Sequence, residues 1–238
     1  TMTAELSDTF RSKRQGVRFV LDAFGQAFPG MPIYLLNLDR EIESLASAVE
    51  HPADFCAANW LASALYVAGQ QRDCLLVDMG STTTDIIPIR KGKVATSSRT
   101  DHDRLVEGSL VYVGCRRTPV CGLVDRLEHG GKSARVMNEL FATIDDARLI
   151  LKATDEDAND CDTADGLPRT RAAAANRLAR MIGLDRRSVN ADAAEALASQ
   201  VIDSAARNLR DGLARVRKSD DPSPLVISGH GAELLGVP

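Results

Sequence analysis

The strongest constraint on the fold is a pair of apolar runs joined by a short polar stretch, LLVDMGSTTTDIIPI, at residues 75–89. Both runs are short and rich in Leu, Ile and Val, which predicts two buried strands. We expect Gly80 to turn the chain sharply with a positive φ and to leave room for a ligand against the backbone. The sequence therefore predicts a β-hairpin with a hydroxyl-rich turn at the edge of a sheet.

This turn has the chemistry of a phosphate-binding loop. The hydroxyls and backbone N–H groups of residues 81–84 form a concave set of donors that suits an anion. Asp78 and Asp85 could hold Mg²⁺, directly or through water, because that ion prefers carboxylates, waters and phosphate oxygens. The stretch is not a P-loop, which needs G-x-x-x-x-G-K-S/T at the start of a helix. The alternative is a Thr-rich turn without a ligand, since Thr favours strands and Asp and Gly favour turns.

A second glycine element, VISGHGAEL at residues 226–234, again predicts a strand, a turn and the start of a helix. Gly229 and Gly231 permit close approach of a phosphate or nucleoside, and the N-terminus of the following helix favours an anion. His230 could be a contact, although a histidine between two glycines is more often a turn residue. We interpret the two turns as two walls of one cleft.

Composition narrows the class of protein. The 238 residues suffice for one large domain or two small ones, and a net charge of −4 argues against a dedicated nucleic-acid binder. We expect neither a membrane span nor a secretory leader. The five cysteines have no C-x-x-C spacing, which predicts reduced thiols in the cytoplasm rather than disulfides or a structural zinc site.

Hydrophobic periodicity and breakers give the remaining elements. Helices are expected at 14–28, 39–52, 54–70, 170–184 and 188–218, the last capped by Ser188 or Asn190. Strands are expected at 32–38, 74–80, 84–90, 93–100, 225–229 and in two segments of 108–124. Residues 136–151 fit a helix or a strand. The acidic stretch 152–170 is expected to be a solvated loop, because it lacks the central glycine and final glutamate of an EF-hand.

The motifs DMGSTTTDI and ISGHGAEL resemble the second phosphate motif and the adenosine motif of the actin-like ATPase superfamily, in the form typical of its hydantoinase/oxoprolinase branch. Further segments resemble one small family, the tetrahydromethanopterin-linked C1-transfer pathway proteins. They are TMTAEL, AANWLASA, DIIPI, DRLVEGSLVYVGCRRTPVCGLV, NELFAT and TADGLPRTR, so the resemblance covers nearly the whole chain. The family's first phosphate motif, D-x-G-G-x-N, has no counterpart here. With the abrupt TMTAEL start and a last helix that barely begins, this predicts a fragment truncated at both ends.

The resemblance implies an α/β actin-like (ribonuclease H-like) fold with two lobes around a phosphate-binding cleft. Residues 1–72 would be the remainder of the first lobe, and 73–238 the second lobe with an inserted segment at about 99–175. It implies a cytoplasmic transferase of methanofuran biosynthesis. Such an enzyme joins an aminomethylfuran methyl diphosphate to the phenol oxygen of γ-glutamyltyramine with Mg²⁺ and releases pyrophosphate. Its partners are these small molecules, not nucleic acid or membrane, and homo-oligomerisation is left open.

The residues that would carry this chemistry follow from the motifs. Asp78 and Asp85 are the candidate metal ligands, and they join Glu139 as candidate catalytic carboxylates. The candidate phosphate ligands are Gly80, Ser81, Thr82, Thr83, Thr84, Gly229, His230 and Gly231. Arg117 could bind a phosphate or the glutamyl carboxylate bidentately, and Asp165 is a candidate substrate or acid–base group.

The plainer readings of these weaker candidates are surface charges for Arg117 and Glu139 and a turn residue for Asp165. Glu5 could also face the cleft. Two other functions stay open. An ATP-dependent kinase or hydantoinase/oxoprolinase-like amidohydrolase would use the same turn for ATP, and a nucleotide-binding regulator would use it without turnover.

Overall fold

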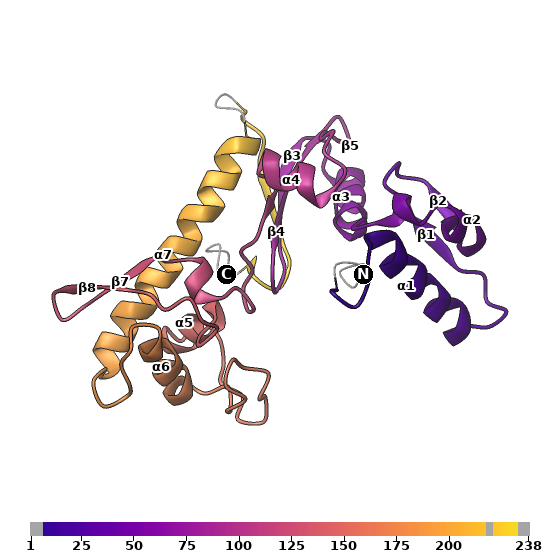
Figure 1. The fold of residues 1–238 in the computed structure, drawn as a ribbon. Helices are drawn as coiled ribbons and strands as arrows, with labels where there is room; N and C mark the ends of the chain where they lie inside the picture. Colours follow the sequence, from indigo (N-terminus) through magenta and orange to yellow (C-terminus); the bar gives the residue numbers. More distant parts are fainter. Residues whose placement is uncertain (1–6, 218–220, 233–238) are drawn as a thin grey trace. The chain divides into compact units, whose positions relative to one another are not determined.

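The structure is a computed structural model that describes residues 7–217 and 221–232 and has a mixed α/β fold (Figure 1). The segment TMTAEL with Glu5, and the helix expected after the second glycine turn, lie outside the described residues. The chain divides into two compact units. The first comprises Thr1–Leu76, Ile87–Glu107 and Pro222–Pro224, and the second comprises Val77–Ile86, Gly108–Asp221 and Leu225–Pro238. The division into lobes at residue 72, with an inserted segment at about 99–175, stays a prediction.

The first unit begins with helix α1 (Lys13–Ala27), which confirms the helix expected at 14–28. The other elements are β1 (Tyr34–Leu36), β2 (Ile42–Ser44), α2 (Leu45–Glu50), the 3-10 turn Pro52–Phe55, α3 (Asn59–Gln70), β5 (Lys93–Val94) and α4 (Asp101–Glu107). A small core is formed by Val17, Leu21, Ala48 and Phe55. Phe24 and Phe28 follow Val17 and Leu21 at helical spacing, but they are exposed.

Two expectations for the first unit are wrong. Residues 39–52 are not one helix, because the Asn37 side chain accepts the N–H groups of Asp39 and Glu41 and closes a turn that pairs β2 antiparallel to β1. The strand expected at 93–100 ends after two residues, and α4 follows it. The signal for α4 was present, since the Thr100 hydroxyl and the Asp103 side chain exchange the hydrogen bonds of a capping box.

The sheet confirms the opening prediction. Strands β3 (Cys74–Met79) and β4 (Thr84–Arg90) are neighbours, and the sheet order is β5-β4-β3-β9, with β6 (Leu110–Val111) also paired to β4. Strand β9 (Leu225–Ser228) lies where a strand was expected before the second glycine turn. The inward-facing residues of β3 and β4 are buried, as two runs of this composition require.

Three helices shape the second unit. They are α5 (Ile144–Ile150), α6 (Arg171–Arg180) and α7 (Ala191–Val216), and α5 and α6 pack against α7 (Figure 1). Asn190 caps α7, as one of the two predicted alternatives. Residues 136–151 are helical only from Ile144, where Thr143 and Asp146 form a capping box. The 108–124 region has one short strand, β6, and a 3-10 turn at Val120–Gly122 instead of two strands.

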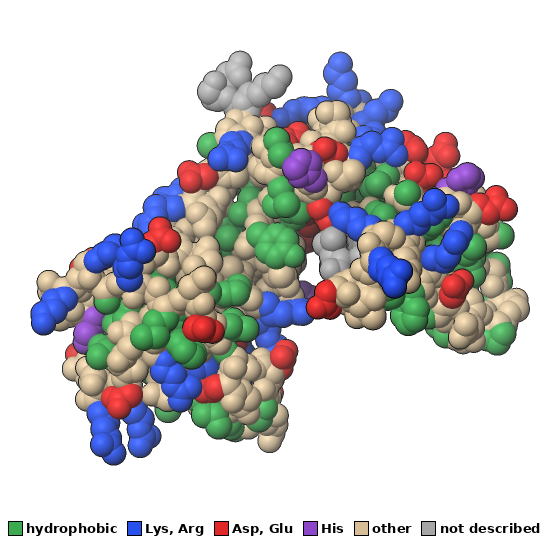
Figure 2. All heavy atoms as spheres, viewed as in Figure 1, with side chains coloured by type: hydrophobic (Ala, Val, Ile, Leu, Met, Phe, Trp, Pro, Cys, Tyr) green, Lys and Arg blue, Asp and Glu red, His purple; other side chains and the backbone are tan. Residues whose placement is uncertain are grey.

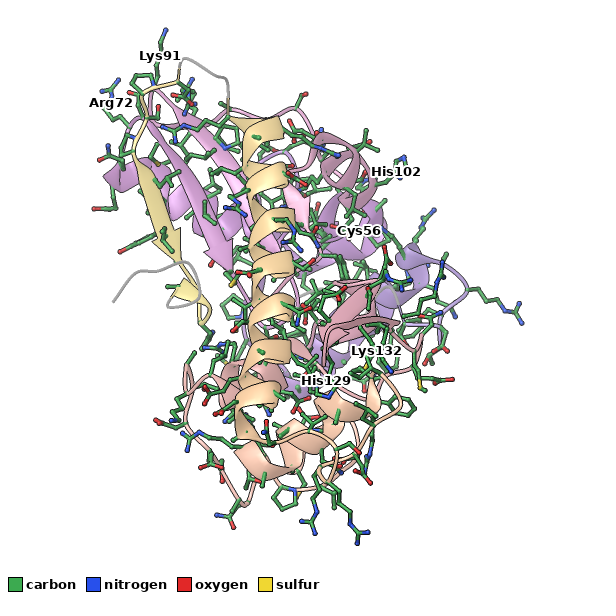
Figure 3. All side chains as sticks on the ribbon, turned by 90° about the vertical axis from the view of Figure 1, so that its left-hand side faces the viewer. Cys56, Arg72, Lys91, His102, His129 and Lys132 are labelled. Atoms are coloured by element: carbon green, nitrogen blue, oxygen red, sulfur yellow. The ribbon has the colours of Figure 1, made fainter. Side chains whose placement is uncertain are left out.

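A hairpin of β7 (Arg126–His129) and β8 (Lys132–Arg135) was missed from the sequence. Gly130 and Gly131 both have positive φ and connect His129 to its partner Lys132, and a two-glycine loop is a recognised hairpin signal. The hairpin packs on α7, where the Gln200 side chain exchanges hydrogen bonds with the backbone of Glu128. Figure 3 shows α7 from the side, with its axis upright in the picture, and labels His129 and Lys132 beside it.

The remaining expectations concern the surface and the cysteines. The stretch 152–170 is irregular, as expected. All five cysteines are free thiols. On the face shown in Figure 2, acidic and basic side chains are interspersed. Within residues 7–217 and 221–232, no helix combines the length and the apolar character needed to cross a membrane.

Candidate functional site

The hairpin turn between β3 and β4 is held by hydrogen bonds on both sides. The Gly80 N–H donates to the Thr83 carbonyl at 2.9 Å. Thr84 is fully buried, and its hydroxyl donates to the Val113 carbonyl at 2.6 Å. The predicted phosphate ligand Thr84 therefore braces the turn from inside. The expected positive φ at Gly80 is wrong, since Gly80 lies outside the left-handed region and a Cβ there would meet only the Thr83 carbonyl, at 3.6 Å.

A loop from the second unit, residues 113–118, lies directly against this turn. The N–H of Cys115 donates to the Gly80 carbonyl at 3.0 Å, and those of Arg116 and Arg117 donate to the Ser81 carbonyl at 3.1 and 2.8 Å. A Cβ on Gly114 would lie 2.3 Å from the Thr82 nitrogen, so this position requires glycine. Sequence reasoning missed Gly114, because nothing in its neighbourhood marks a contact with a turn that lies far away in the chain.

The second glycine turn meets the end of β3. Gly229 has φ of 91°, and a Cβ there would lie 2.3 Å from the Met79 carbonyl oxygen and 2.8 Å from an Asp78 carboxylate oxygen. The Gly231 N–H donates to the same Met79 carbonyl at 3.0 Å. The two glycines thus permit close approach to the backbone of β3, and the close approach of a phosphate or nucleoside stays a prediction. His230 between them is exposed.

These contacts leave donors in the turn for an anion. Among the residues that the structure describes, the N–H groups of Ser81, Thr82 and Thr83 have no acceptor. The Ser81 and Thr82 hydroxyls lie 3.4 Å apart, and the Arg117 guanidinium donates to the Ser81 hydroxyl at 3.1 Å. Arg117 is exposed, so it presents further N–H donors to solvent beside the turn. We call the turn with Arg117 the clasp.

Two carboxylates stand behind the clasp. The pairing of Gly80 with Thr83, continued two residues outward along the hairpin, makes Asp78 and Asp85 cross-strand neighbours, and both are half-buried. Like charges directly opposite one another destabilise a sheet, and a cation relieves that repulsion. Within the described residues, no three His, Cys, Asp or Glu side chains gather as a metal cage. Two carboxylates beside a turn rich in hydrogen-bond donors fit Mg²⁺, which keeps waters and uses few protein ligands.

A cavity of about 220 Å³ opens next to the clasp and shares Arg117 with it. It is lined by Arg116, Arg117, Pro119, Leu140, Thr143, Asp145, Asp146, Asp162, Thr163 and Ala164. These residues come from the segments RRTP, NELFAT and DTADGLP and from the first turn of α5. Segments that lie far apart in the sequence therefore converge on one hollow beside the turn.

Ion pairs of two arginines from α6 connect the segments that line this cavity. The fully buried Arg177 contacts Asp146 at 2.7–2.8 Å and Asp165 at 3.0 Å, and Arg180 contacts Asp165 at 3.2 Å. Burial raises the pKa of Asp146 above its usual value, against the opposing effect of Arg177. Burial also acts to raise the pKa of Asp165, but the Leu167 N–H and Arg177 outweigh it and lower that pKa.

The structure brings most of the predicted site residues together and leaves two apart. Asp78, Asp85, the 80–84 turn, Arg117 and the Gly229–Gly231 turn meet in the second unit. Asp165 lies in the ion-pair network at the cavity wall, and its role toward a substrate stays a prediction. Glu139 is exposed in an irregular segment, not on a helix, and the next residue, Leu140, lines the cavity.

Comparison with known proteins gives three findings. The profile of the hydantoinase/oxoprolinase family matches residues 1–235. The chain is 37% identical over 235 residues to the (4-{4-[2-(gamma-L-glutamylamino)ethyl]phenoxymethyl}furan-2-yl)methanamine synthase of Methanocaldococcus jannaschii, covering 98% of this chain and 71% of that protein. It is 35% identical over 164 residues to the protein of the same name from Methanococcus vannielii, covering 69% of this chain and 73% of that protein.

A solved structure also resembles the chain. It is an acetone carboxylase in its nucleotide-free form, studied for ATP-dependent acetone carboxylation, with a TM-score of 0.56 and 16% identity. The match covers 93% of this chain but 33% of the carboxylase chain, so this chain spans about a third of its length. At this identity the likeness concerns the fold alone.

Proposed function

This chain belongs to the hydantoinase/oxoprolinase family, and from that premise we propose that it is a transferase of methanofuran-type cofactor biosynthesis. It joins an aminomethylfuran methyl diphosphate to the phenol oxygen of γ-glutamyltyramine and releases pyrophosphate. The observation that carries the proposal is the 37% identity, over 98% of the chain, with a synthase whose product contains this aryl ether. The clasp supplies a binding site for the diphosphate that such a reaction needs.

The reaction is a substitution at the methylene carbon of the furan substrate. The phenol oxygen forms a bond to that carbon, and the bond from carbon to the diphosphate oxygen breaks with its electron pair on the leaving pyrophosphate. The phenol proton passes to a base. Negative charge grows on the leaving group, so fixed donors aimed at it lower the barrier. Here those donors are the N–H groups of residues 81–83 and the guanidinium of Arg117.

Asp78 and Asp85 would hold Mg²⁺ beside the diphosphate, because their cross-strand placement gives two carboxylates next to the donor-rich turn. When bound, the ion neutralises charge on the leaving pyrophosphate. Asp78, Asp85 and Glu139 are the candidates for the base that accepts the phenol proton. Of these, the two aspartates adjoin the clasp, whereas Glu139 lies near the cavity.

We also propose that the second unit is part of an actin-like fold in which a phosphate cleft lies between two lobes, and that the enzyme works in the cytoplasm. The two glycine turns support the first point, because both reach the same strand end at Asp78 and Met79. The free thiols are in keeping with the second.

The test is release of pyrophosphate by the purified protein with Mg²⁺, the furan diphosphate and γ-glutamyltyramine, with ATP in a parallel reaction. We expect pyrophosphate when both organic substrates are present and none when either is omitted. Formation of ADP from ATP, without reaction of the furan diphosphate, would instead show a kinase or hydrolase. Nucleotide-dependent association without turnover of either compound would show a regulator.

A further inference from the structure

The volume of the cavity beside the clasp and the charged side chains in its lining restrict which ligands it can bind. Its volume of about 220 Å³ is smaller than the roughly 300–1,000 Å³ that holds a drug-sized molecule. It therefore suits a single small ring better than the extended γ-glutamyltyramine. Pro119, Leu140 and Ala164 give it apolar walls, and Leu140 is 55% exposed and free to pack on a ring.

The acidic side chains of the cavity differ in what they can bind. The Nε and Nη2 of Arg169 donate hydrogen bonds to the two carboxylate oxygens of Asp145, at 2.5 and 2.9 Å, and the Asp145 side chain is 8% exposed. Asp146 is held by Arg177 and is 4% exposed. These two carboxylates are committed to ion pairs within the protein. They stabilise the wall rather than offer a charge to a ligand.

Asp162 is in a different position. Its side chain is 85% exposed and lies 3.7 Å from the Arg116 guanidinium, whose closer partner is Asp160 at 2.6 Å. Asp162 therefore keeps a carboxylate that can accept a cation at the cavity. Arg117, also in the lining, is tied to the clasp through its bond to the Ser81 hydroxyl. The lining thus offers an exposed carboxylate, held only by a long contact to Arg116, as well as the arginine that contacts the clasp.

We infer that this cavity is the subsite for the aminomethylfuran ring, with the diphosphate on the clasp and the ammonium of the aminomethyl group paired with Asp162. The inference rests on the proposed function and adds a specificity residue to it. The relatives' product name contains a furan that carries a methanamine, which is the small ring with a cation that these walls fit. The larger phenolic amine approaches from outside the cavity.

The steady-state test compares Asp162→Asn with wild type and with the control Asp155→Asn. Asp155 is an exposed aspartate of the same loop that does not line the cavity, so its variant makes the same charge change elsewhere. We expect D162N to raise KM for the furan diphosphate about tenfold, to change KM for γ-glutamyltyramine less than twofold, and to have no effect on a furan diphosphate lacking the amine. D155N should match wild type.

The opposite pattern would overturn the inference, namely a raised KM for γ-glutamyltyramine with the furan KM unchanged. Equal effects of D162N and D155N would also overturn it, since they would show a general charge effect.

A binding measurement separates this inference from the proposed function. Calorimetry with furfurylamine and its neutral counterpart furfuryl alcohol, in the presence of pyrophosphate and Mg²⁺, needs no turnover. We expect furfurylamine to bind wild type and D155N at least tenfold more tightly than D162N, and Ala164→Leu to weaken both compounds by filling the cavity. If neither D162N nor A164L changed the affinity for these compounds, the subsite would be refuted even if the enzyme makes the ether. If the enzyme showed no turnover but still bound furfurylamine, and D162N weakened that binding, the proposed reaction would be refuted and the subsite would stand.

Discussion

Gly114 offers the sharpest test of how the clasp is built. In the structure, an added Cβ at this position would lie 2.3 Å from the Thr82 nitrogen and 2.5 Å from the Ser81 carbonyl carbon. Real Cβ contacts are essentially never shorter than 3.0 Å, and both atoms are backbone, which cannot rotate away as a side chain can. Gly114→Ala therefore has to push the turn and the 113–118 loop apart by about 0.7 Å, the difference between 2.3 and 3.0 Å.

The displacement acts on the N–H donors of the turn, which we propose bind the diphosphate. Misplacing a reacting group by ~1 Å costs about 10²-fold in rate, and overpacking costs about 1–3 kcal/mol of stability. We expect G114A to lower kcat for pyrophosphate release by about 10²-fold and to lower Tm by about 2–12 °C, from the usual shift per kcal/mol in a chain of this size. Activity should fall more than stability, because the strain is concentrated at the turn.

The matched control is Gly122→Ala, in the 3-10 turn of the same region. Nothing lies within 4 Å of a Cβ at Gly122, and its φ is not in the left-handed region. G122A should keep the wild-type kcat. It should gain slightly in stability, because alanine lowers the conformational entropy of the unfolded chain. If G114A had the turnover and Tm of G122A, the packing of the loop against the turn would be wrong and the description of the clasp with it.

Three further predictions test the other parts of the site. Asp78→Asn should lower kcat for pyrophosphate release by at least about 10²-fold, because it removes a negative charge at the clasp. Its Tm in thermal unfolding should stay equal or rise slightly, because the change relieves repulsion from Asp85. Thr84→Val leaves the buried Val113 carbonyl without its donor and should cost about 1–3 kcal/mol in urea unfolding, with Thr84→Ser restoring stability; an unchanged midpoint would contradict the bracing role. Asp165 has a lowered folded pKa, so its stabilising effect is present above its ordinary value of 3.8 and is lost as pH falls through the lower folded value. The stability gap between wild type and Asp165→Asn, measured by urea unfolding, should therefore be wide at pH 6 and narrow as the pH falls below 3.8, and a gap that is constant with pH would contradict this.

The local parts of the site could be predicted from the sequence, and the tertiary parts could not. Strands β3 and β4 follow from two apolar runs, and a glycine turn at 229–231 follows from its place after a strand, although the neighbours that exclude a side chain there belong to β3 and to Cys115. The contact between Arg117 and Ser81 joins residues 36 positions apart, so no periodicity or turn rule reports it. The requirement for Gly114 is of the same kind, because the atoms that exclude a side chain come from another segment.

The acidic stretch shows why charge alone misleads. Its composition predicts a solvated loop, and it is irregular, yet Asp160 pairs with Arg116, Glu156 with Arg171, and Asp165 with Arg177 and Arg180. The sequence signal was available in the arginines of RRTP and TRAAAANRLAR, but pairing them with particular aspartates needs the fold.

Arg177 explains why these pairs matter for function. A fully buried guanidinium is costly to desolvate, and removing one partner of a buried pair costs about 3–5 kcal/mol, whereas replacing the whole pair with apolar groups is often neutral. Burial of Arg177 between Asp146 and Asp165 is therefore a poor way to gain stability alone. What the arrangement does provide is a fixed position for the 160–165 loop against the first turn of α5, and both segments contribute residues to the lining of the cavity. Exchange of Arg177 and its buried partner Asp146 together for Met and Leu should thus keep the fold better than Arg177→Met alone, yet still raise KM for the furan diphosphate. If the double variant bound that substrate as wild type does, the network would be structural only.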